Sequence, residues 1–335
     1  MNRNNINFYK KNGYLVYPKI VQIEITNQCP LKCKQCYKTV DAHCMDLKTF
    51  YTVIEELAKF NVKSIMLNGG EPLIHPKFNE ILRCLKRHNM NIYCFTSGFG
   101  LNAKMINELA STDTNLSISL NGSTEVINSL SRDGYNYGIN ALNLLMHSNK
   151  TEYGINWVSR ADNVHDFKNM IALALSKKCK WINVITNKIC NGTLESKMNL
   201  KEYIYLSNII HECSKDIKIN IETCNSLLLS FMNIKRGSLF KGCIAGKEAC
   251  FINVDGYFMP CSHLYYPEKW DSISDYWYKS PTLNDLRKKE SREFCEDCCN
   301  ENKCSFCHAL SKETHDNLLL GYKECPIKNV NIDRF

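Results

Sequence analysis

The chain has 335 residues, of which 44% are hydrophobic and 23% charged, a balance that excludes wholesale disorder. It has no apolar run of about eighteen residues and no secretory signal at its polar start, so we expect a cytoplasmic protein without a membrane partner. The formal charge of +8 would permit a nucleic-acid partner. The unusual feature of the composition is its 19 cysteines. In a cytosolic chain clustered cysteines bind metal more often than they form disulfides.

Short β-branched runs alternate with longer helical patterns up to about residue 190, which is typical of an α/β fold with a parallel sheet. Strands are expected at 19–26, 63–68, 91–96, 115–120, 153–159 and 181–186. Helices are expected at 46–60, with Asp46 as N-cap, at 75–88, with Pro76 near its start, and at 162–178. We count six βα repeats.

The rhythm changes after Thr186. A polar link is followed by an expected helix at 200–214, a short strand at 217–222 and a helix-like segment at 226–234. From Cys243 onward the apolar runs are too short for a core of ordinary size, so this part is expected to depend on bound metal. The organisation predicted is a βα domain at 1–190, a bridging region at 191–240 and a cysteine-rich domain at 241–335.

The first cysteine motif follows the first expected strand. Cys29, Cys33 and Cys36 form a CxxxCxxC pattern. Three thiolates on a short loop can bind three irons of a four-iron cluster and leave the fourth iron with a vacant position, unlike the four-cysteine closure of electron-transfer clusters. A vacant iron can bind a substrate or a cofactor.

The second expected strand ends in Asn68-Gly69-Gly70-Glu71-Pro72. Adjacent glycines let a ligand approach the backbone, and the Glu71 carboxylate could take an ammonium group. By itself GGEP is an ordinary turn before a helix. Beside a three-cysteine loop, at the edge where βα barrels place their chemistry, it favours a binding site.

Together these motifs resemble those of the radical S-adenosylmethionine (radical SAM) enzymes. The resemblance implies a partial (βα)6 TIM barrel and a cluster whose unique iron chelates the amino and carboxylate groups of S-adenosylmethionine. Reduction of that cluster, by a flavodoxin or ferredoxin, would release a 5'-deoxyadenosyl radical that removes hydrogen from a substrate.

Further cofactor-binding positions follow from the same resemblance. They are Ser97, in a polar turn after the third strand, and Ser119 with Arg132, which would meet the cofactor carboxylate. One position departs from the family pattern, because Gln35 stands where an aromatic residue usually contacts adenine. Whether Tyr37 replaces that contact is open.

The C-terminal cysteines resemble a SPASM extension, which carries two auxiliary four-iron clusters in peptide-modifying radical enzymes. The resemblance assigns Cys243, Cys250, Cys261 and Cys307 to the first cluster, and Cys295, Cys298, Cys304 and Cys325 to the second. The spacing before Cys307 is one residue shorter than usual, and His308 occupies the expected position. The alternative is a zinc ribbon of Cys295, Cys298, Cys304 and Cys307. Eleven thiolates on three clusters would reduce the net charge to about +3, so no nucleic-acid partner is expected.

Eight cysteines remain, and most are expected to be small buried hydrophobes: Cys44, Cys84, Cys94, Cys179, Cys190, Cys213, Cys224 and Cys299. Cys224 is also a candidate catalytic residue, as a hydrogen donor to a product radical. The basic run 287–289 is expected to be a solvated helix face, with contact to an acidic peptide as the alternative. His165 and His263 are expected to be structural.

The expected function is maturation of a ribosomally made (RiPP) precursor peptide through a thioether or carbon–carbon cross-link. Formylglycine formation by an anaerobic sulfatase maturase is disfavoured, because Ser262 stands where those enzymes carry an aspartate. Two different functions stay open: a peptide epimerase that uses Cys224, and a non-catalytic iron–sulfur carrier or zinc-stapled binding module. The few residues before the first strand suggest that the peptide leader binds the core, the bridge or a separate leader-binding protein.

Overall fold

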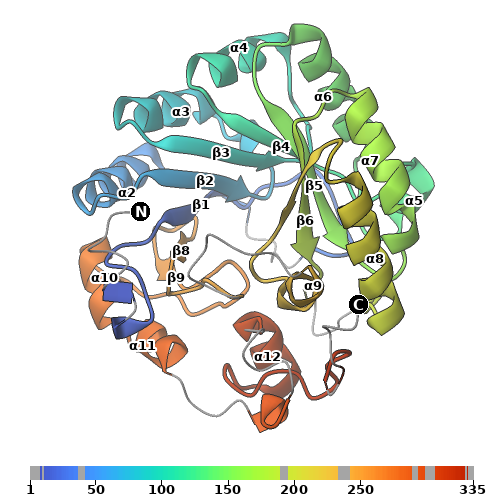
Figure 1. Ribbon diagram of the computed structural model, residues 1–335. Coiled ribbons are helices and arrows are strands. Elements are labelled where there is room, and N and C mark those ends of the chain that lie inside the picture. Colours follow the sequence, from blue (N-terminus) through green and yellow to red (C-terminus); the bar gives the residue numbers. More distant parts are fainter. Residues whose placement is uncertain are drawn as a thin grey trace.

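The computed structural model describes residues 8–9, 11–36, 42–188, 195–232, 242–288, 293–298, 306–328 and 330, with the backbone alone at 313–315. Its centre is a nine-stranded sheet in the order β7-β6-β5-β4-β3-β2-β1-β8-β9 (Figure 1). The parallel strands expected from the sequence are β1 (Ile20–Thr26), β2 (Ser64–Gly69), β3 (Asn91–Thr96), β4 (Asn115–Ser119), β5 (Tyr153–Ser159), β6 (Trp181–Thr186) and β7 (Lys218–Ile221). Each end lies within one residue of its expected position, and the α/β fold with a parallel sheet is confirmed.

The two faces of the sheet differ in chemistry because side chains alternate along each strand. Val21, Ile23 and Ile25 of β1 are fully buried in the core. The intervening side chains on the other face are polar and bond across strands: Asn68 Nδ2 donates to Gln22 Oε1 (3.3 Å), and Asn183 Nδ2 donates to Asn156 Oδ1 (2.6 Å). One face of the sheet therefore supports the hydrophobic core, and the other offers amide groups.

Helices cover the apolar face as an arc around the strands (Figure 1). They are α2 (Leu47–Lys59), α3 (Phe78–Arg87), α4 (Ala103–Ser111), α5 (Glu125–Ser129), α6 (Tyr135–Ser148), α7 (Phe167–Ser176) and α8 (Leu200–Cys213). Short 3-10 turns at Pro72–Ile74 and Val164–Asp166 precede α3 and α7. The expected start of α3 at residue 75 is wrong, because His75 precedes a proline and is held in an extended conformation.

Asp46 caps α2 as expected, and its carboxylate accepts hydrogen bonds from Thr49 N (3.0 Å) and Thr49 Oγ1 (2.6 Å). These bonds hold the Asp46 pKa below its ordinary value. The cap therefore stabilises the fold above the unfolded-state pKa of about 4, and weakens as the pH falls through the folded-state pKa.

We expect Asp46→Ala to lower the free energy of unfolding at neutral pH by about 1 kcal/mol. Urea unfolding of the full chain measures this difference. Asp46→Asn is the control, because its amide oxygen can still accept the Thr49 N–H bond. Equal losses in the two variants would show that the cap is not responsible.

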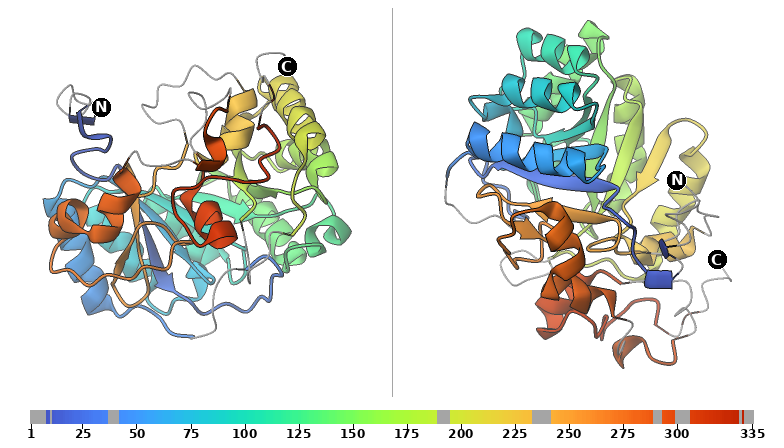
Figure 2. Two further views of the ribbon diagram at one scale, coloured as in Figure 1. Left: turned by 90° about the horizontal axis from the view of Figure 1, so that it is seen from below. Right: turned by 90° about the vertical axis from the view of Figure 1, so that its left-hand side faces the viewer.

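The C-terminal part of the chain joins the same sheet. β8 (Ala249–Ile252) pairs in parallel with β1, and β9 (Phe258–Met259) pairs antiparallel with β8. Strands from all three regions expected from the sequence thus share one sheet. The helices of this part are α9 (Ser226–Phe231), α10 (Ile273–Lys279), α11 (Pro281–Arg287) and α12 (His308–His315). Figure 2 shows α11 and α12 away from α3 and α4, whereas α10 reaches the end of α2, where the Tyr278 and Phe60 rings lie 6.0 Å apart.

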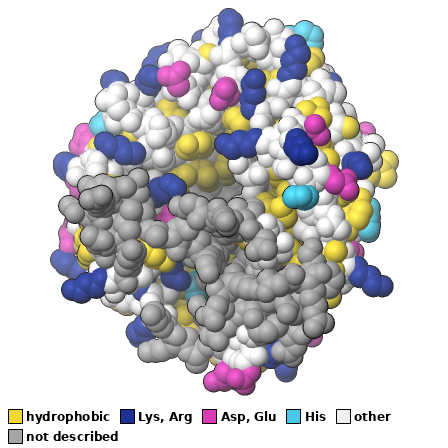
Figure 3. Space-filling view, in the orientation of Figure 1, with side chains coloured by type: hydrophobic (Ala, Val, Ile, Leu, Met, Phe, Trp, Pro, Cys, Tyr) yellow, Lys and Arg dark blue, Asp and Glu magenta, His cyan; other side chains and the backbone are white. Residues whose placement is uncertain are grey.

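The surface of one face mixes both signs of charge. Figure 3 shows Lys and Arg interspersed with Asp and Glu over its upper part, around a hollow where hydrophobic side chains are exposed. Within the described ranges, none of the helices is both long and apolar enough to cross a bilayer.

Candidate functional site

The expected site residues lie at the carboxyl ends of β1 to β4. These strands are parallel, so their ends meet at one edge of the sheet. The cysteine loop follows β1, the GGEP turn follows β2, and Ser97 follows β3. Ser119 is the last residue of β4.

The GGEP turn packs directly on the backbone that leads into the cysteine loop. Gly70 N donates to Thr26 O (2.7 Å), and Glu71 N donates to Gln28 O (2.8 Å). A Cβ atom at Gly70 would overlap the Gln28 carbonyl oxygen, and one at Gly69 would overlap that of Thr26. Glycine is therefore required at both positions so that the two loops can touch.

Gly70→Ala is expected to displace the GGEP turn from the cysteine loop and to lower the affinity for S-adenosylmethionine by at least about tenfold, or 1.4 kcal/mol. Equilibrium dialysis with the reconstituted protein measures this affinity. Gly100→Ala is the control, because it has a left-handed backbone but no atom within 4 Å of the added methyl group. Equal affinities in the two variants would contradict the packing argument.

The Glu71 carboxylate is completely buried and saturated by donors from its own chain. Oε1 accepts from Leu73 N (3.1 Å) and Thr96 Oγ1 (2.5 Å), and Oε2 accepts from Ser97 N (2.8 Å) and from Ser97 Oγ. Burial raises its pKa, although these bonds act in the opposite direction. Glu71 therefore ties the ends of β2 and β3 together. The sequence predicts that this carboxylate takes an ammonium group, but its oxygens are already occupied by donors of its own chain. The backbone of the glycine turn is therefore the polar surface available to a ligand.

The far side of the cysteine loop is bound to the turn after α5. Lys32 N donates to Asp133 Oδ2 (2.8 Å), and Gln35 N donates to Ser131 O (3.2 Å). These contacts bring Arg132 beside the loop, and its buried Nε has no hydrogen-bond partner in the part of the chain that the structure describes. A half-buried arginine whose Nε donor is unsatisfied suits a carboxylate ligand.

Gln35, the departure from the family pattern, has a structural partner. Its Oε1 accepts from Asn121 Nδ2 (2.7 Å), and Asn121 also donates to Ser131 Oγ (2.8 Å). Sequence reasoning missed Asn121 and Asp133, because neither belongs to a motif. Both residues are far along the chain from the cysteine loop, so no local sequence pattern indicated that they contact it. Tyr37 lies outside the described residues.

The three loop cysteines are accessible. Cys29 and Cys36 are exposed and Cys33 is half-buried. Burial of its sulfur raises the pKa of Cys29, and Glu71, Cys33 and Cys36 raise it further, which places these groups within electrostatic reach of one another. Across the described ranges, no three Cys, His, Asp or Glu side chains group tightly enough for one metal ion. In a cubane each thiolate binds a different iron, so the accessible thiols, the glycine cradle and Arg132 fit a cluster with its ligand.

A second group of cysteines lies between the turn after β7 and the start of α12. Cys224 hydrogen-bonds to Cys243 and Cys307, and Cys261 lies within electrostatic reach of both. The bond from Cys224 lowers the pKa of Cys243. Lys188 is beside this group and pairs with Glu222 (Nζ to Oε1, 3.1 Å). Burial lowers the Lys188 pKa, but Glu222 and the neighbouring sulfurs raise it more.

The remaining described cysteines occupy several parts of the chain. Cys250 lies on β8 opposite Val21, and Cys295, Cys298 and Cys325 are half-buried in the last part of the chain. Cys84, Cys94, Cys179 and Cys213 are buried, as expected of small hydrophobes. Cys190, Cys299 and Cys304 lie outside the described residues.

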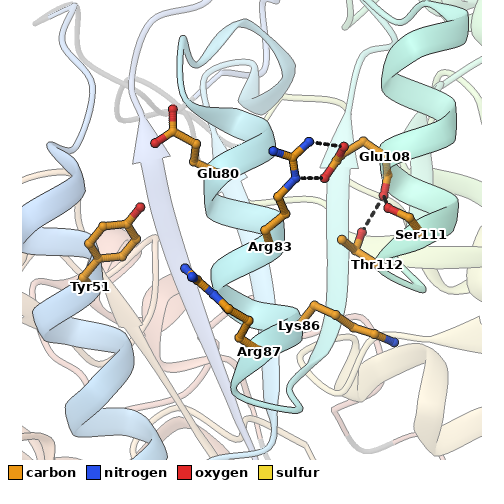
Figure 4. A pocket seen from close by; sticks show the side chains of 8 residues that line it. All are labelled: Tyr51, Glu80, Arg83, Lys86, Arg87, Glu108, Ser111 and Thr112. Carbon is orange, nitrogen blue, oxygen red and sulfur yellow. Dashed lines mark hydrogen bonds and ion pairs between the residues drawn. The ribbon is translucent and has the colours of Figure 1, made fainter.

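A pocket of about 710 Å³ lies elsewhere, between α2, α3 and α4 (Figure 4). Arg83 crosses it to form two hydrogen bonds with Glu108 (2.6 and 2.7 Å). Its residues near the ends of α3 and α4 come just before β3 and β4 begin. None of the residues that line the pocket belongs to the cysteine loop or to the GGEP turn.

The chain is similar to several known proteins. Residues 23–174 match the Radical SAM superfamily model. A tungsten-containing aldehyde ferredoxin oxidoreductase cofactor-modifying protein of Pyrococcus furiosus is 32% identical over 103 residues, 29% of each chain. PqqA peptide cyclase of Ruegeria pomeroyi is 24% identical over 305 residues, 84% of this chain and 79% of that protein. The match with the Pyrococcus furiosus protein thus spans less than a third of that protein's length.

SuiB of Streptococcus suis has the same fold. Its structure with S-adenosylmethionine gives a TM-score of 0.78 at 17% identity, over 96% of this chain and 80% of SuiB. Its structure with the precursor peptide SuiA gives 0.76 at 16% identity, over 95% and 78%. Residues 23–174 are thus similar to the radical SAM superfamily, and the chain has the fold of SuiB.

Proposed function

We propose that this chain is a cytoplasmic radical SAM maturase that cross-links a ribosomally made precursor peptide. The docking of the GGEP turn against the cysteine loop, with Arg132 on the loop's other side, carries the proposal. When bound, the cluster and S-adenosylmethionine supply the hydrogen-abstracting radical. The chain's own residues would orient the cofactor. The Gly69–Gly70 backbone would bind its ammonium group. Arg132, with Ser97 and Ser119, would bind at its carboxylate.

A peptide substrate is supported by two observations. The polar face of the sheet presents amides such as Gln22, Asn68 and Asn183, which match the donors and acceptors of a polypeptide backbone. The relative named as a cyclase acts on the peptide PqqA, and SuiB has been seen with its precursor peptide. The leader would bind the core, the bridge or a separate leader-binding protein.

Two auxiliary four-iron clusters complete the proposal and make 241–335 a SPASM domain. Cys243, Cys261 and Cys307 would serve the first cluster, and Cys295, Cys298, Cys304 and Cys325 the second. Such clusters can accept the electron that remains after a carbon radical closes a cross-link. A flavodoxin or ferredoxin would supply the electron that starts each cycle.

Incubation with the peptide encoded beside the gene tests the proposal. The reconstituted, dithionite-reduced protein is expected to form 5'-deoxyadenosine and a peptide that has lost two hydrogens, about 2 Da by mass spectrometry. Unchanged mass with deuterium uptake from heavy water would replace cross-linking by epimerisation. Absence of 5'-deoxyadenosine with all clusters present would replace the enzyme by an electron carrier or binding module.

A further inference from the structure

The turn after β7 places one cysteine next to the C-terminal cysteines. Glu222 N donates to Val184 O (2.9 Å), and Asn225 N donates to Glu222 O (2.9 Å), which closes the turn around Cys224. Asn225 Nδ2 also reaches Ser159 Oγ at the end of β5 (3.3 Å). The sheet itself therefore holds this turn.

The position of Cys224 matches that of a fourth ligand. Its sulfur is within hydrogen-bond distance of the sulfurs of Cys243 and Cys307, and Cys261 completes the group. Cys243 and Cys307 are only 4% and 2% exposed. Cys224 and Cys261 are half-buried, and four thiols gathered in this way can supply the ligands of a four-iron cluster.

Cys250, which the resemblance assigns to this cluster, has other surroundings. It is 1% exposed on β8, where strand alternation places it on the same face as Ile252 in the hydrophobic core. Arg287 lies within electrostatic reach of Cys250, and its guanidinium lies 3.7 Å from the ring centre of Tyr14 and donates to Gly246 O (2.7 Å). A cubane beside Cys250 would displace close-packed side chains.

The charge around the Cys224 group also suits a cluster. Four thiolates on a cubane core leave a net negative charge, and a buried charge requires a nearby opposite charge. The Lys188 ammonium, which is also paired with Glu222, lies beside Cys224, Cys261 and Cys307 and is only 14% exposed at its side chain.

We propose that Cys224, and not Cys250, is the fourth ligand of the auxiliary cluster held by Cys243, Cys261 and Cys307. This assignment rests on the proposed function, which supplies the auxiliary clusters. It replaces the interpretation of Cys224 as a hydrogen donor, because a metal-bound thiolate has no S–H hydrogen to give. It also connects the turn after β7 directly to the cluster.

The test uses the full chain with Cys29, Cys33 and Cys36 changed to alanine, so that only auxiliary clusters bind iron. After anaerobic reconstitution this background is expected to hold about eight irons per chain in two clusters. Adding Cys224→Ala should remove up to half of this iron and alter one of the two electron paramagnetic resonance signals after reduction. The matched control, Cys250→Ala, should retain the iron and both signals.

A third variant separates ligand loss from misfolding. Cys224→Ser should keep most of the iron and shift the resonance of one cluster only, because a serine oxygen can replace the thiolate. Full iron and unchanged signals in Cys224→Ala, or iron loss in Cys250→Ala, would overturn the assignment alone. A background protein without iron would overturn the auxiliary clusters of the proposed function, and the assignment with them.

Discussion

Alanine at Cys29, Cys33 or Cys36 is expected to lower 5'-deoxyadenosine formation by at least about 10³-fold, which corresponds to about 4 kcal/mol in the activation barrier. Each change removes one of the three thiolates that the proposed cluster needs, and the loop offers no fourth cysteine to replace it. Anaerobic turnover assays with dithionite, followed by chromatography of the nucleoside product, measure the effect.

The control for this prediction is Cys84→Ala, which removes a buried thiol on α3 that takes no part in the site. This variant is expected to bind the same amount of iron and to turn over at a similar rate. Undiminished turnover in the three loop variants would refute the assignment of the radical-forming site.

Glu71→Gln is expected to lower the free energy of unfolding by about 2–4 kcal/mol. The fully buried carboxylate accepts four hydrogen bonds, and an amide would turn its NH₂ group toward donors that then lack an acceptor. The GGEP turn would shift with the side chain, so S-adenosylmethionine should bind more weakly as well. Anaerobic urea unfolding and equilibrium dialysis measure the two effects.

Glu108→Gln is the matched control, because Glu108 pairs with Arg83 on the outer helices. The Arg83 side chain is largely exposed, so solvent screens this pair and its loss should cost less stability than the loss at Glu71. If both variants lost equally little stability, Glu71 would not be the connection between β2 and β3 that its hydrogen bonds indicate. Loss of cofactor binding without loss of stability would instead indicate direct contact between Glu71 and the cofactor.

Two helices show what local sequence patterns can and cannot predict. The sequence predicts α2 together with its cap, because the apolar spacing and Asp46 both lie within one segment. It does not predict α6 (Tyr135–Ser148), since the apolar residues there are interrupted by asparagines and by Gly138. A side chain at that glycine would press on the Leu120 side chain, which follows β4, and no local pattern predicts this contact.

The sequence by itself determined the parallel strands, the CxxxCxxC loop and the GGEP turn at their carboxyl ends, because each depends on residues close together in the chain. Only the tertiary structure decided that Glu71 faces inward, that β8 pairs with β1, and that Cys224 rather than Cys250 lies with Cys243 and Cys307. These facts depend on packing between segments far apart in sequence. The spacing of cysteines in the sequence shows which of them could bind a cluster. The packing of distant segments decides which of them lie close together.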